Sequence, residues 1–202
     1  MTPPDASRAG GCYQLAALRR DLRADIDAYI DFASQYRDGG KTLRRRLSAL
    51  LTPSVTACAL YRVSHWLYAK GWSRAALLAA WCNLLLTRVS ICPASTIGGG
   101  LYIPHPATSI VFQGCAGRNL RLFAGSGVSA APLSPLHRHA LRDAPTLGDD
   151  VVLGYKALIL GPVAIGRGCL IGIDAVVDRD IPPGATVLAM RRRPTGNRPR
   201  DH

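Results

Sequence analysis

A six-residue repeat in the second half of the chain constrains the fold more than any other feature of the sequence. From position 147 onward an aliphatic side chain recurs every sixth residue, and a second small or aliphatic side chain follows each of them four positions later. A period of six fits neither the 3.6-residue turn of an α-helix nor the two-residue alternation of an ordinary strand. Three such steps make one triangular coil of a parallel β-helix, with the aliphatic side chain in the narrow core and the small one where the coil turns. The first set is Leu147, Leu153, Ile159, Ile165, Ile171 and Val177, and the second set is Val151, Ala157, Val163, Cys169, Ala175 and Ile181.

The same repeat begins earlier in the chain, slips by one residue and is then interrupted. Residues 129–146 contain three prolines and two histidines and break the pattern, so we expect a loop extruded from the β-helix there. The early repeat positions are Ile91, Ile97 and Ile103, followed after the slip by Ile110, Ala116, Leu122 and Val128.

The first ninety residues carry apolar residues at helical spacing instead. Pro53 suits the start of a helix and Gly71 suits its interruption. The expected fold class is therefore α+β, an N-terminal α-helical domain followed by a parallel β-helix of hexapeptide repeats. Helices are predicted over residues 15–36, 42–51, 53–70 and 73–86. The predicted organisation is a flexible leader (1–11), a helical domain (12–88), the β-helix (89–190) and a basic tail (191–202).

The chain is strongly basic, with 25 Lys and Arg against 13 Asp and Glu and a formal net charge of +12. Such a balance favours an anionic partner, which is a nucleic acid, a membrane surface or a phosphorylated cofactor. We expect no nucleic-acid binding, because the basic residues are not interleaved with aromatic ones and no known nucleic-acid-binding module is present.

The longest apolar stretch, residues 75–87, is bracketed by Arg74 and Arg88. It is shorter than the ~20 apolar residues that span a bilayer, so we expect a buried helix, with peripheral contact to a membrane as the alternative. The N-terminus lacks the apolar core of a signal peptide, which favours a cytoplasmic protein whose six cysteines are free thiols. No cysteine stands in a Cys-x-x-Cys pair, which argues against a structural zinc site.

Three segments together resemble the serine O-acetyltransferase family. Residues 61–68, Tyr-Arg-Val-Ser-His-Trp-Leu-Tyr, resemble the element that ends that family's helical domain. Residues 91–105 resemble its entry into the β-helix and the histidine that follows, and residues 180–187 resemble its Val-Pro-Pro-Gly-Ala-Thr-Val. The resemblance covers residues 36–193 and implies that the β-helix is left-handed.

The resemblance also implies roles for residues around the acceptor. His105 matches the family's general base, and a histidine suits that role because its pKa lies near neutrality. Ser90 stands where the family has an aspartate that orients the base, so a full counter-charge is missing there. Pro104 replaces the family's substrate-binding aspartate, while Arg142 and Asp38 match two other acceptor contacts.

On the cofactor side, the resemblance implies a groove between neighbouring β-helices that binds acetyl-CoA as co-substrate, and no metal. The residues implied for CoA are Gly154, Lys156, Ala157, Arg167, Arg191 and Arg192.

The expected activity is acetyl-CoA-dependent O-acetylation of a small hydroxyl-bearing acceptor, with L-serine, the first step of cysteine biosynthesis, as the default. The alternatives are an O-acetyltransferase that acts on a sugar or another small hydroxyl compound in polysaccharide or secondary-metabolite biosynthesis, and a noncatalytic β-helix scaffold. The family implies a homotrimer or a dimer of trimers. The sequence ends in Asp201-His202, not in the isoleucine that a cysteine synthase reads in that family, so no stable cysteine-synthase complex is expected.

Overall fold

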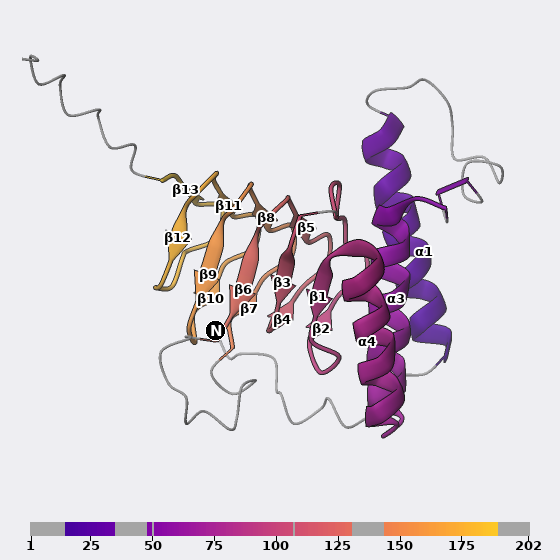
Figure 1. Ribbon diagram of the computed structural model, residues 1–202. Coiled ribbons are helices and arrows are strands. Elements are labelled where there is room, and N and C mark those ends of the chain that lie inside the picture. Colours follow the sequence, from indigo (N-terminus) through magenta and orange to yellow (C-terminus); the bar gives the residue numbers. More distant parts are fainter. Residues whose placement is uncertain (1–14, 35–47, 50, 107, 131–143, 190–202) are drawn as a thin grey trace, which may run out of the picture.

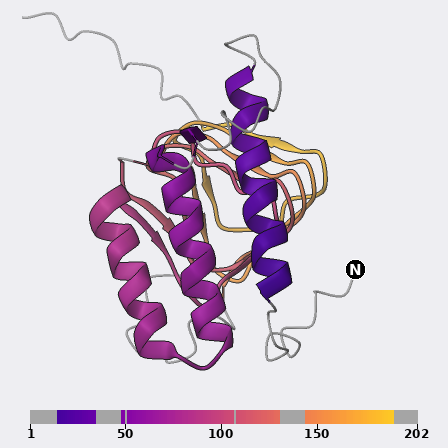
Figure 2. The ribbon, with the colours of Figure 1, turned by 90° about the vertical axis from the view of Figure 1, so that its right-hand side faces the viewer.

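The computed structural model describes residues 15–34, 48–49, 51–106, 108–130 and 144–189. In the part of the chain that the structure describes, three long helices precede a stack of short strands (Figure 1). The helices are α1 (Leu15–Ser34), α3 (Pro53–Ala69) and α4 (Ser73–Thr87). They lie side by side in one layer across one end of the strand stack, with α3 between α1 and α4 (Figure 2).

Local chemistry fixes where α3 starts and ends. The Thr52 hydroxyl accepts a hydrogen bond from the Val55 N–H at 3.5 Å, and Pro53 takes the first helical position, where its missing N–H costs nothing. Gly71 follows the helix with φ of +81°, a conformation that favours glycine, and so turns the chain back into α4.

The strands form a parallel β-helix of three sheets, and the chain passes from the first sheet to the second and then to the third in each coil. All pairings between described strands are parallel. The first sheet contains β1 (Val89–Ile91), β3 (Ile110–Phe112), β6 (Gly127–Ser129), β9 (Leu158–Leu160) and β12 (Val176–Val177). The second contains β2 (Thr96–Ile97), β4 (Cys115–Ala116), β7 (Thr146–Leu147) and β10 (Ala164–Ile165). The third contains β5 (Arg121–Leu122), β8 (Val152–Leu153), β11 (Leu170–Ile171) and β13 (Thr186–Val187).

The six-residue repeat is the core of this β-helix, as predicted. The aliphatic positions from Leu147 to Val177 are buried, and so are the small positions from Val151 to Ala175, while Ile181 packs partly buried against them. The predicted interruption is slightly narrower than expected, because Ser129 and Thr146 already belong to β6 and β7.

The one-residue slip is the sum of two changes. The register pairs Phe112, not Ile110, with Ile91 and Val128, so the passage from the third sheet back to the first, between Ile103 and Phe112, is three residues longer than the six-residue step. The next step, from Phe112 to Ala116, is two residues shorter. The other described passages from the third sheet to the first, at residues 123–126, 154–157 and 172–175, are shorter than the one that carries the slip. The slip therefore marks the place where the coil bulges outward.

The segment 61–68 clamps the helical layer to the first coil. The Arg62 guanidinium pairs with the Asp25 carboxylate of α1 through two hydrogen bonds, of 2.9 and 3.0 Å, and both side chains are almost completely buried. Arg62 also donates to the carbonyls of Ile97 and Gly98, at 2.5 and 2.7 Å. The resemblance in this segment is thus explained by contacts that join α1, α3 and the start of the β-helix.

Four further hydrogen bonds strengthen the clamp. The Asp25 carboxylate accepts the backbone N–H of Gly100 and Leu101, at 2.9 and 2.8 Å. The Tyr61 hydroxyl donates to the Ser95 carbonyl at 3.0 Å. The His65 Nδ1 lies 2.9 Å from the Pro93 carbonyl oxygen, which can only accept, so the proton is on Nδ1.

The prediction that residues 75–87 form a buried helix was half wrong. The helix forms as α4, but most of its large apolar side chains are exposed, among them Leu78, Trp81 and Leu85. The reason is that α4 uses small and polar residues to contact its neighbours, with Ala76, Asn83 and Thr87 buried.

Candidate active site

His105 lies in the bulged corner between the third and first sheets, with its side chain exposed. Its carbonyl accepts a hydrogen bond from the Thr108 hydroxyl at 3.3 Å, which helps to hold the corner. The imidazole makes no hydrogen bond with any residue in the described part of the chain. It stacks near the Tyr155 ring, with centroids 6.3 Å apart and an interplanar angle of 24°. Tyr155 in turn contacts Phe123, with centroids 5.3 Å apart.

Three of the residues predicted to bind CoA lie along the same corner. Gly154, Lys156 and Ala157 stand between β8 and β9, in the passage from the third sheet to the first, beside Tyr155. The Lys156 side chain is exposed, and its N–H donates to the Ala124 carbonyl of the coil below at 3.0 Å. The structure therefore places an imidazole and an ammonium group on one edge of the β-helix.

The backbone at this edge is closely packed. A Cβ on Gly154 would stand 3.0 Å from backbone atoms of residues 171–173, so only glycine fits without a shift. The Ala157 side chain is fully buried, and its N–H and carbonyl already bond to Gly154 and Gly127.

Ser90 lies in the middle of β1 between two buried residues, so its side chain points outward from the first sheet. In the described residues, the Ser90 hydroxyl makes no side-chain hydrogen bond and no carboxylate contacts the His105 ring. Ser90 pairs with Val111 of the next strand in the first sheet. The same outward-facing row continues through Gly127, Leu158 and Val176. This row is largely apolar and open to solvent, and it borders the His105 edge.

Arg167 is not brought to that edge. It lies between β10 and β11, where the chain passes from the second sheet to the third. Pro104, by contrast, lies directly beside His105 and is half-buried. The remaining predicted site residues lie outside the described part of the chain: Asp38, Arg142, Arg191 and Arg192.

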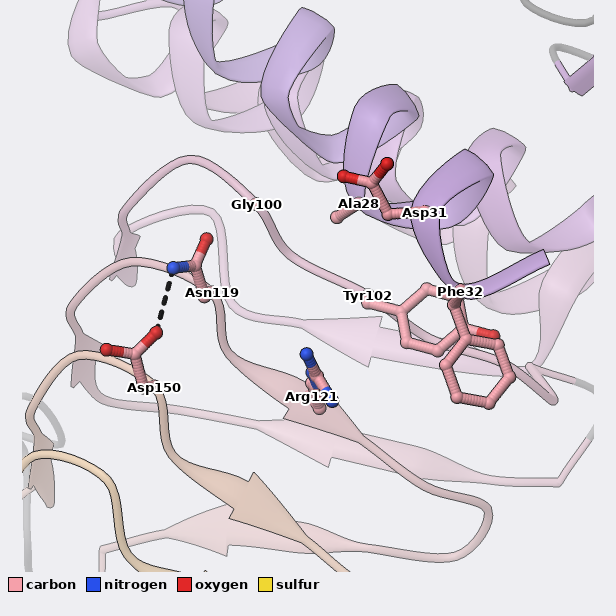
Figure 3. A pocket seen from close by; sticks show the side chains of 8 residues that line it. All are labelled: Ala28, Asp31, Phe32, Gly100, Tyr102, Asn119, Arg121 and Asp150. Carbon is pink, nitrogen blue, oxygen red and sulfur yellow. Dashed lines mark hydrogen bonds between the residues drawn. The ribbon is translucent and has the colours of Figure 1, made fainter. Parts of the chain in front are cut away.

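Two features of the surface were not predicted from the sequence. One is the aromatic neighbour Tyr155, which the repeat marks only as a corner residue. The other is a cavity of about 250 Å³ between α1 and the β-helix (Figure 3). The Asn119 amide donates to the Asp150 carboxylate at its rim, at 2.8 Å, and Arg121 also lines it. The cavity lies at the passages from the second sheet to the third, which carry Gly100, Asn119 and Asp150. His105 lies instead in a passage from the third sheet to the first.

Known proteins share this architecture. No family model matches the chain. Over 140 residues, however, it is 35% identical to a serine acetyltransferase of Mycobacterium tuberculosis, a match that covers 68% of this chain and 58% of that protein. The chain belongs to the serine acetyltransferase family.

Solved serine acetyltransferases share the fold of this family member. The native enzyme 1 of Entamoeba histolytica superposes with a TM-score of 0.73 at 24% identity, covering 91% of this chain and 67% of that one. The Neisseria gonorrhoeae serine acetyltransferase in complex with serine superposes with a TM-score of 0.70 at 25% identity, covering 93% and 72%. This serine acetyltransferase homologue spans about three fifths of the length of the first curated relatives that it matches.

Proposed function

We propose that the protein transfers the acetyl group of acetyl-CoA to the hydroxyl of a small acceptor, with L-serine as the first candidate and His105 as general base. The observation that carries the proposal is the His105 imidazole, which is exposed, makes no hydrogen bond with the described residues and lies in the corner created by the slip in the repeat. A base must reach the hydroxyl that it deprotonates, and an imidazole at an open edge can do so.

The proposed chemistry moves one proton through His105. Acetyl-CoA supplies the acetyl group as a thioester. The His105 imidazole takes the proton of the acceptor hydroxyl as the oxygen attacks, and gives it to the departing thiolate, so that no net proton is lost. Ser90 stands in for the family's orienting carboxylate and can hold a tautomer by hydrogen bonding, but it cannot balance the imidazolium charge.

On the cofactor side, the proposal uses the edge that carries Gly154, Lys156 and Ala157. The exposed Lys156 ammonium suits a phosphate group. Arg191 and Arg192 are proposed as further phosphate contacts. Since Arg167 lies at a different edge, we propose that its cation reaches the same ligand only from a neighbouring subunit.

The open row of the first sheet supports a homotrimer, or a dimer of trimers, in which each groove is closed by the next copy. Val111, Leu158 and Val176 expose apolar side chains along that row, as expected of a surface that meets another subunit. A left-handed coil and a cytoplasmic location remain part of the proposal.

A sugar or other hydroxyl compound is the second candidate acceptor. Pro104 beside His105 offers no charge to an acceptor ammonium group, and that favours a neutral acceptor. In the serine proposal, Asp38 and Arg142 bind the ammonium and carboxylate groups instead. The serine complex of the Neisseria gonorrhoeae relative supports the amino acid as the first acceptor to test.

The test is release of free thiol from acetyl-CoA by the purified protein, with L-serine, homoserine and a panel of sugars. His105→Ala is expected to lower the acceptor-dependent rate by at least about 100-fold, because a general base typically accelerates a reaction about 10²–10⁴-fold. Ser109→Ala, in the same exposed corner, is the matched control and keeps the rate. If the protein binds CoA but no acceptor stimulates the release of free thiol, the result supports the noncatalytic scaffold instead.

A further inference from the structure

Helix α4 is built with its apolar side outward. The side that contacts α3 is small and polar: the Asn83 amide donates to the Ala57 carbonyl at 3.0 Å, and the Ser64 hydroxyl of α3 donates to the Ala76 carbonyl at 3.0 Å. Thr87 donates to the Asn83 side chain at 2.7 Å. These contacts hold the helix in one orientation, so its outward side is fixed by the fold.

The outward side of α4 exposes large apolar side chains. Leu85 is 73% exposed, Leu78 67% and Trp81 65%. α4 lies at the edge of the helical layer with α3 on one side only, as Figure 2 shows. An apolar surface of this extent normally marks a contact with a protein or a membrane. The α4 apolar face consists of Trp72, Leu77, Leu78, Trp81, Leu84, Leu85 and Leu86.

The charge around this face selects the kind of partner. Residues 39–142, which include α3, α4 and the first two coils of the β-helix, contain twelve Lys and Arg residues and no Asp or Glu, so the whole net charge of +12 falls in this half of the sequence. Arg74 and Arg88 are exposed at the two ends of α4. A second copy seated on this face would bring like charges together, whereas an anionic surface would be attracted.

The dimensions of α4 fit a helix that lies on a bilayer. Its 15 residues extend about 22 Å, which is less than the ~30 Å of a hydrocarbon core. In the part of the chain that the structure describes, no helix is long and apolar enough to cross a membrane. The exposed rings of Trp72 and Trp81 are of the type that is enriched at the boundary between headgroups and acyl chains.

We propose that the α4 apolar face docks the protein on an anionic lipid surface. The leucines and tryptophans of the face enter the boundary between headgroups and acyl chains, and Arg74 and Arg88 contact lipid phosphates. The proposal is independent of the acetyltransferase activity, because none of these residues belongs to the His105 edge.

The experiment is flotation of the full chain with two kinds of vesicle, phosphatidylcholine alone and phosphatidylcholine mixed equally with phosphatidylglycerol. Binding is expected to the mixed vesicles only, and it weakens as salt is added. The double variant Leu78→Gln with Leu85→Gln is expected to weaken partitioning about tenfold or more for each leucine. The matched control is Ile173→Gln, which replaces an apolar side chain 61% exposed on the β-helix.

A second pair of variants tests the charges. Arg74→Gln is expected to weaken partitioning about fivefold, as one basic residue at an anionic surface contributes about 1 kcal/mol. Its control is Arg179→Gln, whose side chain is 83% exposed on the β-helix and far from α4 in sequence. Thermal unfolding of each variant confirms that it folds.

Three results would overturn the proposal. One is no flotation with either vesicle, and another is equal flotation with both. The third is light scattering that shows the wild-type assembly coming apart in the double leucine variant, since the face would then join copies of the chain.

Discussion

Replacing Arg62 by methionine tests the clamp between the helical layer and the β-helix. The Asp25 side chain is fully buried beside Arg62, so the change leaves its carboxylate without a counter-charge, and it removes the donors to the carbonyls of Ile97 and Gly98. Breaking a buried ion pair from one side costs about 3–5 kcal/mol. Asp25 keeps two backbone N–H donors, so we expect a loss near the lower end, about 3 kcal/mol in the free energy of unfolding.

The pH dependence of this loss gives a second readout. Burial raises the pKa of Asp25 above the ordinary value of a carboxyl group, and the Arg62 guanidinium opposes that rise. Without Arg62 the rise is larger, so protonation stabilises the folded variant at low pH. The difference between wild type and Arg62→Met is therefore expected to shrink as the pH falls.

The assay is urea unfolding followed by circular dichroism, at one fixed protein concentration because assembly shifts apparent stability. Arg20→Met is the matched control, since Arg20 also lies 2.9 Å from an aspartate but its side chain is 75% exposed. It is expected to cost no more than about 1 kcal/mol. If Arg62→Met costs no more than Arg20→Met, the reasoning from burial is refuted.

Two further variants test other parts of the fold. Burial lowers the pKa of His65, so the folded state disfavours its charged form; the stability that it contributes is present above pH ~6.5 and is lost as the pH falls through the lowered value. We expect the melting temperature to fall between pH 7 and pH 5, and we expect the fall to be smaller in His65→Gln. If the melting temperature of the variant depends on pH as steeply as that of the wild type, His65 is not the group responsible. Gly166→Ala is expected to destabilise by about 1–3 kcal/mol, because its Cβ would stand 2.3 Å from the Pro183 nitrogen. Gly168→Asn is the control, because no atom lies within 4 Å of a Cβ at that position and asparagine tolerates its positive φ. If the two variants lose the same stability in thermal melts, the clash at Gly166 is ruled out as the cause.

The β-helix was predictable because its pattern is local. Each six-residue step carries its own core residue, and the slip between Ile103 and Ile110 showed where the coil must bulge, at the corner of His105. The clamp was not predictable, because Asp25 and Arg62 stand 37 residues apart and no periodicity links them. The exposed side of α4 was missed for a related reason: composition shows that a helix is apolar but not which side its neighbours cover.

The site was predicted in part. Residues share a corner when they lie one coil of about eighteen residues apart, as three six-residue steps require. Lys156 and Arg167 are eleven residues apart, which places them on different edges, so the spacing already contradicted their grouping. His105 and Phe123 are eighteen residues apart, and the aromatic group beside the candidate base could have been found in this way.

The clamp also has a consequence for the order in which the protein folds. In a coiled stack each turn gains stability from its neighbours, so the first turn lacks one side of its support. Here the helical layer supplies that side through Arg62 and Asp25. Since the helices are synthesised before the coils, every later turn emerges from the ribosome next to a turn that is already anchored, and the β-helix can lengthen from its amino-terminal end.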